Sequence, residues 1–140
     1  MFYNNLPSHT SYYLNGSRWE DAWYDSDDNE HKTDGPAIIR YYENGLIKTE
    51  IWLQKGVRTR TLGPAYTTYY QNGHKKLEMW YLNGRLTRLF NNSVYRFNEE
   101  TGELANAHWS SSDILTVLNL IVFVIAIVCF SFSFIFMPLH

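Results

Sequence analysis

The chain has 140 residues, one cysteine and a net charge of −2, so it fits one domain with an appendage and forms no intrachain disulfide. Its five histidines lack the spacing of metal ligands, and it contains no Gly-rich phosphate loop and no cysteine cluster. We therefore expect no enzyme, no metal site and no cofactor, and we expect no nucleic-acid partner.

The charge is unevenly distributed along the chain. Residues 1–34 hold seven acidic and two basic side chains, a net charge of −5, whereas residues 35–113 hold seven acidic and ten basic ones, a net charge of +3. Residues 1–11 have neither a basic segment nor an apolar run, so we interpret them as an N-terminal arm and expect no signal peptide. The single cysteine, Cys129, fits a reducing compartment.

The segment of residues 34–62 recurs 28 residues later, and the rest of the chain is organised around this repeat. The two copies match without a gap at pairs that include Glu50/Glu78, Trp52/Trp80, Gly56/Gly84 and Arg60/Arg88. Two weaker copies flank them, the last with one inserted residue before Gly102. In all four copies a Trp lies seven residues after a turn glycine: Gly16/Trp23, Gly45/Trp52, Gly73/Trp80 and Gly102/Trp109. A fixed period indicates an array of small units that rely on their neighbours to bury apolar surface.

Each unit has the pattern of a β-hairpin. Its first segment, as in residues 37–42, is rich in β-branched and aromatic residues, which suit a pleated sheet. The Asn-Gly pairs at 44–45 and 72–73 then predict a tight turn in which both residues have positive φ angles. We therefore predict a mainly β fold: an elongated antiparallel meander of about eight strands over residues 8–109.

The return half of each unit alternates in polarity. In the second unit Ile51 and Leu53 face one side and Trp52 the other. A second glycine turn, at residues 55–56 and again at 83–84, leads into the connection to the next unit. The connection ends in Gly-Pro, and the proline suits a strand start because it has no N–H to donate to a ladder.

These units resemble the MORN-type repeat, in the variant that runs from a basic residue through Asp-Gly-Pro-Ala, an aromatic pair and Asn-Gly to Glu-x-Trp. Residues 32–52 and 60–80 carry the pattern most closely, and the resemblance extends loosely over residues 12–109. It implies an elongated β-meander that serves as a scaffold, a dimerisation surface or a membrane-proximal module. The variant is frequent in large DNA viruses and phages, and it brings no shared catalytic residues.

An acidic segment stands where the second turn of the first unit is expected, with the carboxylates of Asp25, Asp27, Asp28 and Glu30. The alternation is similar to a calcium loop, but the required glycine is absent and Pro36 stands in place of the bidentate glutamate. We favour a solvated loop over a metal site. We expect this loop to lie far from the membrane and to bind a basic patch on a partner, with Trp23 and Trp52 as aromatic anchors.

Two further sets of side chains allow two interpretations each. Seven basic residues form either a stripe that attracts anionic lipid or nucleic acid or, as we favour, a solvated face with ion pairs across strands: Lys55, Arg58, Arg60, Lys75, Lys76, Arg85 and Arg88. The tryptophans form either a partner-binding row on an open face or, as we favour, pack on the tyrosine pair of the next unit: Trp23, Trp52, Trp80 and Trp109.

Residues 114–137, from Ile114 to Met137, are 24 residues without a charge. As a helix with a rise of about 1.5 Å per residue they span about 36 Å, enough to cross a hydrocarbon core of about 30 Å. We predict a transmembrane helix in contact with lipid, with residues 110–113 as its cap and linker and residues 138–140 as a short tail. A stripe of small and polar side chains suits either helix–helix packing or bonding to the helix's own carbonyls: Thr116, Asn119, Ala126 and Ser133.

These features together predict a structural protein. Carrying a tail of three residues across a bilayer is easier than carrying 113, so we expect the repeats on the cytosolic side. The family resemblance favours a minor capsid or virion membrane protein that links an internal membrane to an overlying protein layer, with other structural proteins as partners. The alternative is a lipid-binding or signalling adaptor that uses the basic face of the repeats.

Overall fold

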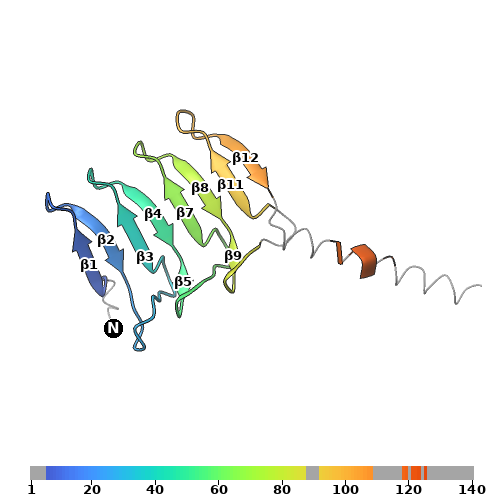
Figure 1. The fold of residues 1–140 in the computed structure, drawn as a ribbon, viewed down its shortest axis with the longest axis horizontal. Coiled ribbons are helices and arrows are strands. Elements are labelled where there is room, and N and C mark those ends of the chain that lie inside the picture. The colour runs from blue at the N-terminus through green and yellow to red at the C-terminus, as the bar shows by residue number, and fades with distance from the viewer. Residues whose placement is uncertain (1–5, 88–91, 109–117, 120, 124, 126–140) are drawn as a thin grey trace, which may run out of the picture.

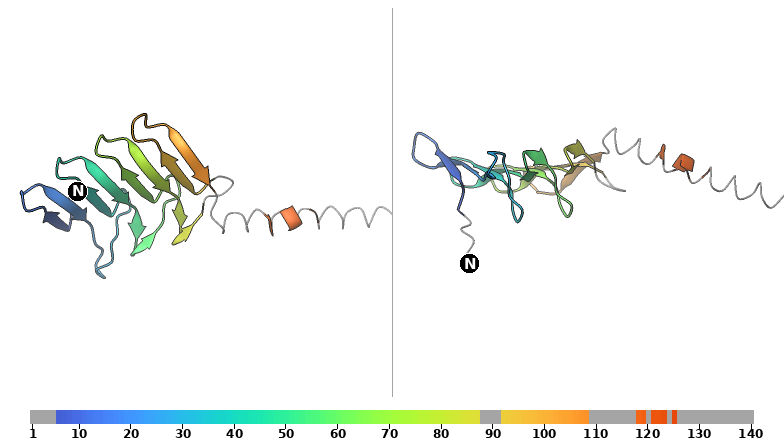
Figure 2. Two further views of the ribbon diagram at one scale, coloured as in Figure 1. Left: turned by 45° about the horizontal axis from the view of Figure 1, so that its top comes forward. Right: turned by 90° about the horizontal axis from the view of Figure 1, so that it is seen from below.

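A computed structural model describes residues 6–87, 92–108, 118–119, 121–123 and 125. Within them the chain forms one eight-stranded antiparallel sheet, in the order β1-β2-β3-β4-β7-β8-β11-β12. Figure 1 shows the strands side by side, and Figure 2 shows the sheet edge on as a single layer. The predicted mainly β meander is confirmed. Its strands are β1(His9–Tyr12), β2(Arg18–Ala22), β3(Ile38–Tyr41), β4(Ile47–Ile51), β7(Tyr66–Tyr69), β8(Lys75–Met79), β11(Val94–Phe97) and β12(Leu104–His108).

Successive units join through the return strand of one and the first strand of the next. The three junctions share one register: Ala22 lies opposite Ile38, Ile51 opposite Tyr66, and Met79 opposite Val94. The backbone N–H of the Trp after each return strand donates to the carbonyl that precedes the next strand, in the pairs Trp23–Ala37 (2.9 Å), Trp52–Ala65 (2.8 Å) and Trp80–Ser93 (2.8 Å). The sequence repeats because each unit presents the same edge to its neighbour.

The loops that close the long hairpins have one left-handed residue, the glycine, with φ of 84° at Gly45 and 88° at Gly73. The expectation that the preceding asparagines also have positive φ is wrong. Instead the Asn44 Oδ1 accepts a hydrogen bond from the backbone N–H of Leu46 (3.1 Å), and the loop closes from the Tyr42 N–H to the Leu46 carbonyl (2.8 Å). This wider loop shifts the register beside the turn, between Arg40 and Tyr41.

The second glycine turns form two-stranded sheets of their own, β5(Leu53–Gln54) with β6(Val57–Arg58), and β9(Tyr81–Leu82) with β10(Arg85–Leu86). Both turn residues are left-handed, with φ of 50° and 73° at Lys55 and Gly56, as a two-residue hairpin loop requires. The expected simple connection is therefore a second hairpin. The return strand ends before Trp52 and Trp80, because the chain leaves the long sheet there.

The core is a small cluster where the long and short hairpins meet. Ala37, Ile51 and Leu53 form it, with exposed fractions of 0, 4 and 8%, and Ile38 and Tyr66 pack against it. Ile51 and Leu53 are therefore buried together, as their alternation with Trp52 predicts. A single layer has no room for a larger core among the described residues.

The first and last units keep the same frame at their ends. β1 begins at His9, so the arm expected over residues 1–11 is shorter, because Pro7 and Ser8 precede β1 as Pro36 and Ala37 precede β3. In the fourth unit the inserted residue lies in the turn, which closes from the Asn98 N–H to the Glu103 carbonyl (2.9 Å).

The described part of the C-terminal region is α-helical, at residues 118–119, 121–123 and 125. Its large apolar side chains are exposed: Leu118, Ile121, Val122, Phe123 and Ile125. Within the described residues no helix has the length and the apolar character needed to cross a membrane. Asn119 of the proposed packing stripe is exposed, and the linker at 110–113 and the other three stripe residues lie outside the described residues: Thr116, Ala126 and Ser133.

Candidate interaction surface

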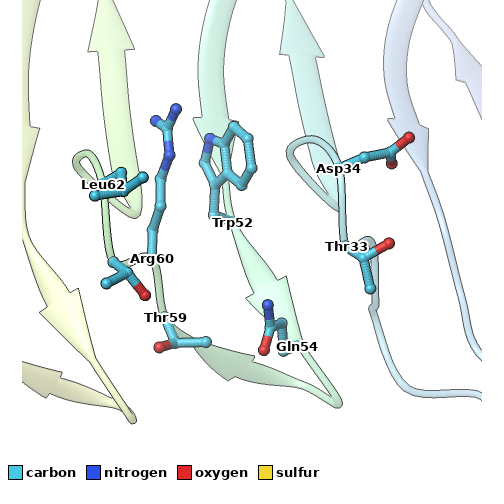
Figure 3. A pocket seen from close by; sticks show the side chains of 8 residues that line it. Thr33, Asp34, Trp52, Gln54, Thr59, Arg60 and Leu62 are labelled. Carbon is cyan, nitrogen blue, oxygen red and sulfur yellow. The ribbon is translucent and has the colours of Figure 1, made fainter.

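Two of the repeated tryptophans are covered by a basic side chain from the connection that follows them. The Nζ of Lys32 lies 3.7 Å from the ring centroid of Trp23, and the Cζ of Arg60 lies 3.7 Å from that of Trp52. Figure 3 shows the Arg60 side chain extended along the indole of Trp52. A cation in this position is attracted by the ring quadrupole, by about 0.5–1 kcal/mol at exposed sites and about 2 kcal/mol when desolvated. These contacts hold each connection against the sheet.

The glycine of each Gly-Pro-Ala segment makes room for this cation. A Cβ added to Gly63 would lie 2.6 Å from the Arg60 Cζ, and one added to Gly35 would lie 3.2 Å from the Lys32 Cε. The Nη1 of Arg60 also donates to the Pro64 carbonyl (3.2 Å). The spacing from basic residue to glycine therefore corresponds to a cation held between an indole and the backbone.

An open groove of about 370 Å³ lies beside Trp52, between two successive connections. Thr33 and Asp34 line one wall, and residues 59–62 line the other, with Gln54 below the indole (Figure 3). The carboxylate of Asp34 points away from Trp52, and the Arg60 guanidinium lies along the indole, so the two charges do not converge (Figure 3). The groove is thus an aromatic contact surface with polar walls.

The second tyrosine of each aromatic pair reaches forward to the next unit. The hydroxyl of Tyr13 donates to the Tyr41 carbonyl (2.8 Å), that of Tyr42 to the Tyr69 carbonyl (2.7 Å), and that of Tyr70 to the Phe97 carbonyl (3.2 Å). The sequence analysis missed this ladder. Its signal was the recurrence of a second tyrosine at a position where the repeat needs only an aromatic residue.

The first tyrosine of the pair reaches backward instead. The Tyr41 hydroxyl donates to Asp21 Oδ2 (2.9 Å), and the Tyr69 hydroxyl donates to Glu50 Oε2 (2.7 Å). Burial, and then the adjacent carboxylate, raise the pKa of both phenols above the usual value for tyrosine. Asp21 is almost fully buried and also accepts hydrogen bonds from Thr10 and Arg18, so this acid is structural.

The acidic loop separates into two kinds of carboxylate. Asp25 points into the loop, where its Oδ1 accepts hydrogen bonds from the backbone N–H groups of Asp27 (2.9 Å) and Asn29 (3.0 Å). The bond from Asn29 lowers the pKa of the Asp25 carboxyl. Asp27 and Asp28 are exposed to solvent, and the half-buried Glu30 pairs through its backbone with Tyr24. Asp25 therefore shapes the loop, and Asp27 and Asp28 are its solvent-facing acids.

The basic side chains are dispersed over aromatic rings and acids. The Cζ of Arg58 lies 5.1 Å from the ring centroid of Tyr66 and 5.5 Å from that of Tyr81, and Lys76 lies 5.3 Å from that of Tyr70. Lys75 forms an ion pair with Glu78 of its own strand (2.6 Å). The pair across strands is Arg40 with Glu20 (2.7 Å). Lys55 and Arg85 are exposed on the short hairpins, and Arg88 lies outside the described residues.

The tryptophans form no fully open row. Trp23, Trp52 and Trp80 are each half-buried, and the covering groups on Trp23 and Trp52 are cations, where we expected the tyrosine pair of the next unit. Trp109 lies outside the described residues. Trp19, which the repeat pattern does not include, packs edge to face on Tyr13 at a centroid distance of 5.5 Å.

Comparisons with protein-family models, with curated proteins and with solved structures give no match. Among the residues that the structure describes, no group of three or more His, Cys, Asp or Glu side chains is placed to hold a metal ion. The function is therefore inferred from the geometry of the chain itself.

Proposed function

We propose that this chain is a non-enzymatic scaffold of the MORN-repeat type, anchored in a membrane by residues 114–137, that links a bilayer to an overlying protein layer. The observation that carries the proposal is the uncharged stretch of 24 residues. The described side chains of that stretch, such as Val122 and Phe123, are exposed on helical backbone. Exposed apolar side chains on a helix are what lipid contact requires, since the helix satisfies its own backbone.

The repeat array suits the role of a spacer. The contacts between its units recur: the tyrosine ladder, the shared register and the cation on the indole. Because each contact joins one unit to the next, the array resists bending at every junction. Eight strands at about 4.8 Å spacing place β1 about 34 Å from β12, which is the end nearer the anchor.

The setting that we propose is a virion with an internal membrane, with the repeats on its cytosolic or capsid-facing side. The resemblance to the MORN variant of large DNA viruses supports this setting. Asp27 and Asp28 lie at the end of the array remote from the anchor, exposed and acidic. They are the side chains that we expect to meet a basic patch of the protein layer.

Flotation of the full chain with neutral liposomes tests the anchor. Replacing Val122 and Ile125 by arginine places two charges in the apolar segment, at about 2.5–3.5 kcal/mol each near the centre of a bilayer. We expect the wild type to float with the liposomes and to resist high salt and carbonate, and the double variant to remain in the bulk solution. Asp27→Asn with Asp28→Asn is the matched control and should float normally. Flotation of the arginine variant would contradict the anchor.

Cross-linking of intact particles tests the link to a protein layer. The wild-type repeats should cross-link to another structural protein, and the Asp27→Asn/Asp28→Asn variant should be incorporated less without loss of flotation. Absence of any cross-link to another particle protein would contradict the scaffold role.

The alternative is an adaptor that binds anionic lipid, and the exposed Lys55 and Arg85 on the short hairpins are the observation in its favour. The anchor-deficient arginine variant separates the two functions. Binding of that variant to anionic vesicles at low salt, lost at high salt, would support the adaptor.

A further inference from the structure

The long sheet ends in two edge strands, β1 and β12. Within the described residues no strand pairs with the outer side of either one. β12 has the sequence Leu-Ala-Asn-Ala-His, without a formally charged residue or a proline, and four of its five residues are exposed. Proteins usually protect a sheet edge with charges, prolines or bulges, and an unprotected edge is a template for another strand.

The backbone groups that face outward from β12 follow from the inner junctions. There the Trp after each return strand donates its N–H to the next unit, as Trp80 does to Ser93 (2.8 Å), and alternation points the groups two residues earlier the same way. The His108 carbonyl faces inward, where it accepts from the Ser93 N–H (3.1 Å). Ala107 and Ala105 therefore present their N–H and C=O groups to the outer side.

We propose that the outer edge of β12 binds an extended strand of a partner protein through main-chain hydrogen bonds. The side chains specify that strand. Where the inner return strands carry an acid, opposite Ile39, Thr67 and Tyr95 of the next unit, β12 carries Ala107. A large apolar side chain of the partner fits opposite this methyl group, and a tyrosine hydroxyl there finds no acid.

A second copy joined head to tail does not fit this edge. The second tyrosine of the aromatic pair is replaced by Asn98 in the fourth unit, so the forward hydroxyl contact is missing, and Ala107 removes the acid. At the other end Leu6 occupies the place of Gly35 and Gly63, where the repeat needs space for a cation. Each end of the array thus lacks the groups with which one unit binds the next.

A two-fold pair of β12 strands does not fit either, and this step rests on the proposed anchor. Two identical strands related by a two-fold axis run antiparallel, so the chain would leave the pair in opposite directions. The two apolar segments could not then enter one bilayer from the same side. A strand from a different protein meets neither obstacle.

Photochemical cross-linking of the full chain in detergent tests the proposal. The probe is a synthetic peptide with the sequence of residues 36–42, in which benzoylphenylalanine replaces Ile39, the residue that lies opposite Asp21 in the β2–β3 junction. We expect cross-links confined to residues 104–108. Ala107→Pro removes one outward N–H, leaves the inward hydrogen bonds, and should lower the yield at least fivefold, whereas Ala107→Ser keeps the N–H and should change it less than twofold.

Ala107→Lys provides a second test should the proline variant lose its β circular dichroism, because an edge charge blocks strand addition without altering the backbone. Unchanged yield in the folded edge variants, cross-links elsewhere on the chain, or no cross-link at all would overturn the proposal. A wild-type oligomer that Ala107→Lys dissociates would show that the occupant is a second copy. The cross-linking needs no bilayer, so a failed flotation would overturn the anchor and leave the strand capture as a separate result.

Discussion

The junction between the second and third units differs from the outer edge of the fourth unit in nearly every contact, although both begin with a return strand. At the junction the Tyr69 hydroxyl meets Glu50, the Tyr42 hydroxyl meets the Tyr69 carbonyl, and Arg60 covers Trp52. At the outer edge Ala107 and Asn98 occupy the places of the acid and of the second tyrosine.

This difference shows what the repeat consists of. A hairpin forms at both places, so the strand pattern and the turn glycine are properties of a single unit. The acid, the second tyrosine and the cation are present where another unit follows, and they belong to the junction. The fourth unit is therefore a terminal unit by its side chains as well as by its position.

Truncating the core side chain at the junction should have the largest effect on stability. Ile51 is 4% exposed, and replacing it by alanine should lower the free energy of unfolding by about 2–4 kcal/mol, because both apolar contact and a cavity are involved. Leu104, in β12, is 54% exposed, and Leu104→Ala should cost less than about 0.5 kcal/mol. Denaturant titration of the full chain, followed by circular dichroism, measures both. Equal losses would remove the distinction between junction and edge.

The tyrosine–acid contact should be removable at one junction and restorable at another. Tyr69→Phe should lower the free energy of unfolding by about 1–2 kcal/mol, because the half-buried Glu50 loses a donor. Phe97 stands at the Tyr69 position of the fourth unit, where Glu78 already supplies the acid with one oxygen bonded to Lys75. Phe97→Tyr should therefore raise stability by about 0.5–1 kcal/mol in the same titration. A destabilised Phe97→Tyr variant would show that the units are not equivalent.

Filling the space beside the cation should have a moderate effect that differs between two units. Gly63→Ala should cost about 1 kcal/mol, because the new Cβ displaces the Arg60 guanidinium from Trp52. Gly35→Ala should cost less, since its Cβ is 3.2 Å from a flexible lysine methylene. Thermal unfolding, with tryptophan fluorescence as the probe of the indole, separates the two. Equal effects would mean that the cation does not determine the glycine.

The smallest effect should be a loss of stability in alkali. The raised pKa of Tyr41 and Tyr69 means that the folded state holds these protons more tightly than the unfolded state. Their contribution to stability is complete below about pH 10, the unfolded value, and falls as the pH rises above it. The Tyr41→Phe/Tyr69→Phe variant should show a flatter dependence of melting temperature on pH between about 9 and 11. An unchanged slope would assign the alkaline loss to other groups.

Much of the fold was predictable because its signals are local. Alternation at Ile51, Trp52 and Leu53 depends on the two-residue period of a strand, and the turn glycines depend on backbone sterics. The inserted residue of the fourth unit was likewise placed correctly, near Gly102, since a loop accepts an extra residue more readily than a paired strand.

Other features needed the folded chain. The turn at Lys55-Gly56 makes a hairpin of its own because Gly56 donates its N–H to the Glu30 carbonyl of the preceding unit (2.9 Å). The acidic loop shows the same limit. Four carboxylates are equivalent by composition, and only the loop conformation separates the inward Asp25 from the exposed Asp27 and Asp28.

The amino-acid sequence by itself determined the period, the hairpin units and the uncharged C-terminal stretch, because each depends on residue type and spacing along the chain. Only the tertiary structure decided which groups meet: Tyr42 with the Tyr69 carbonyl, Tyr69 with Glu50, and Arg60 with Trp52. Side chains with several rotatable bonds can reach several neighbours. Which neighbour they reach is settled once the strands are paired in register, since the register places donor, acceptor and ring at contact distance.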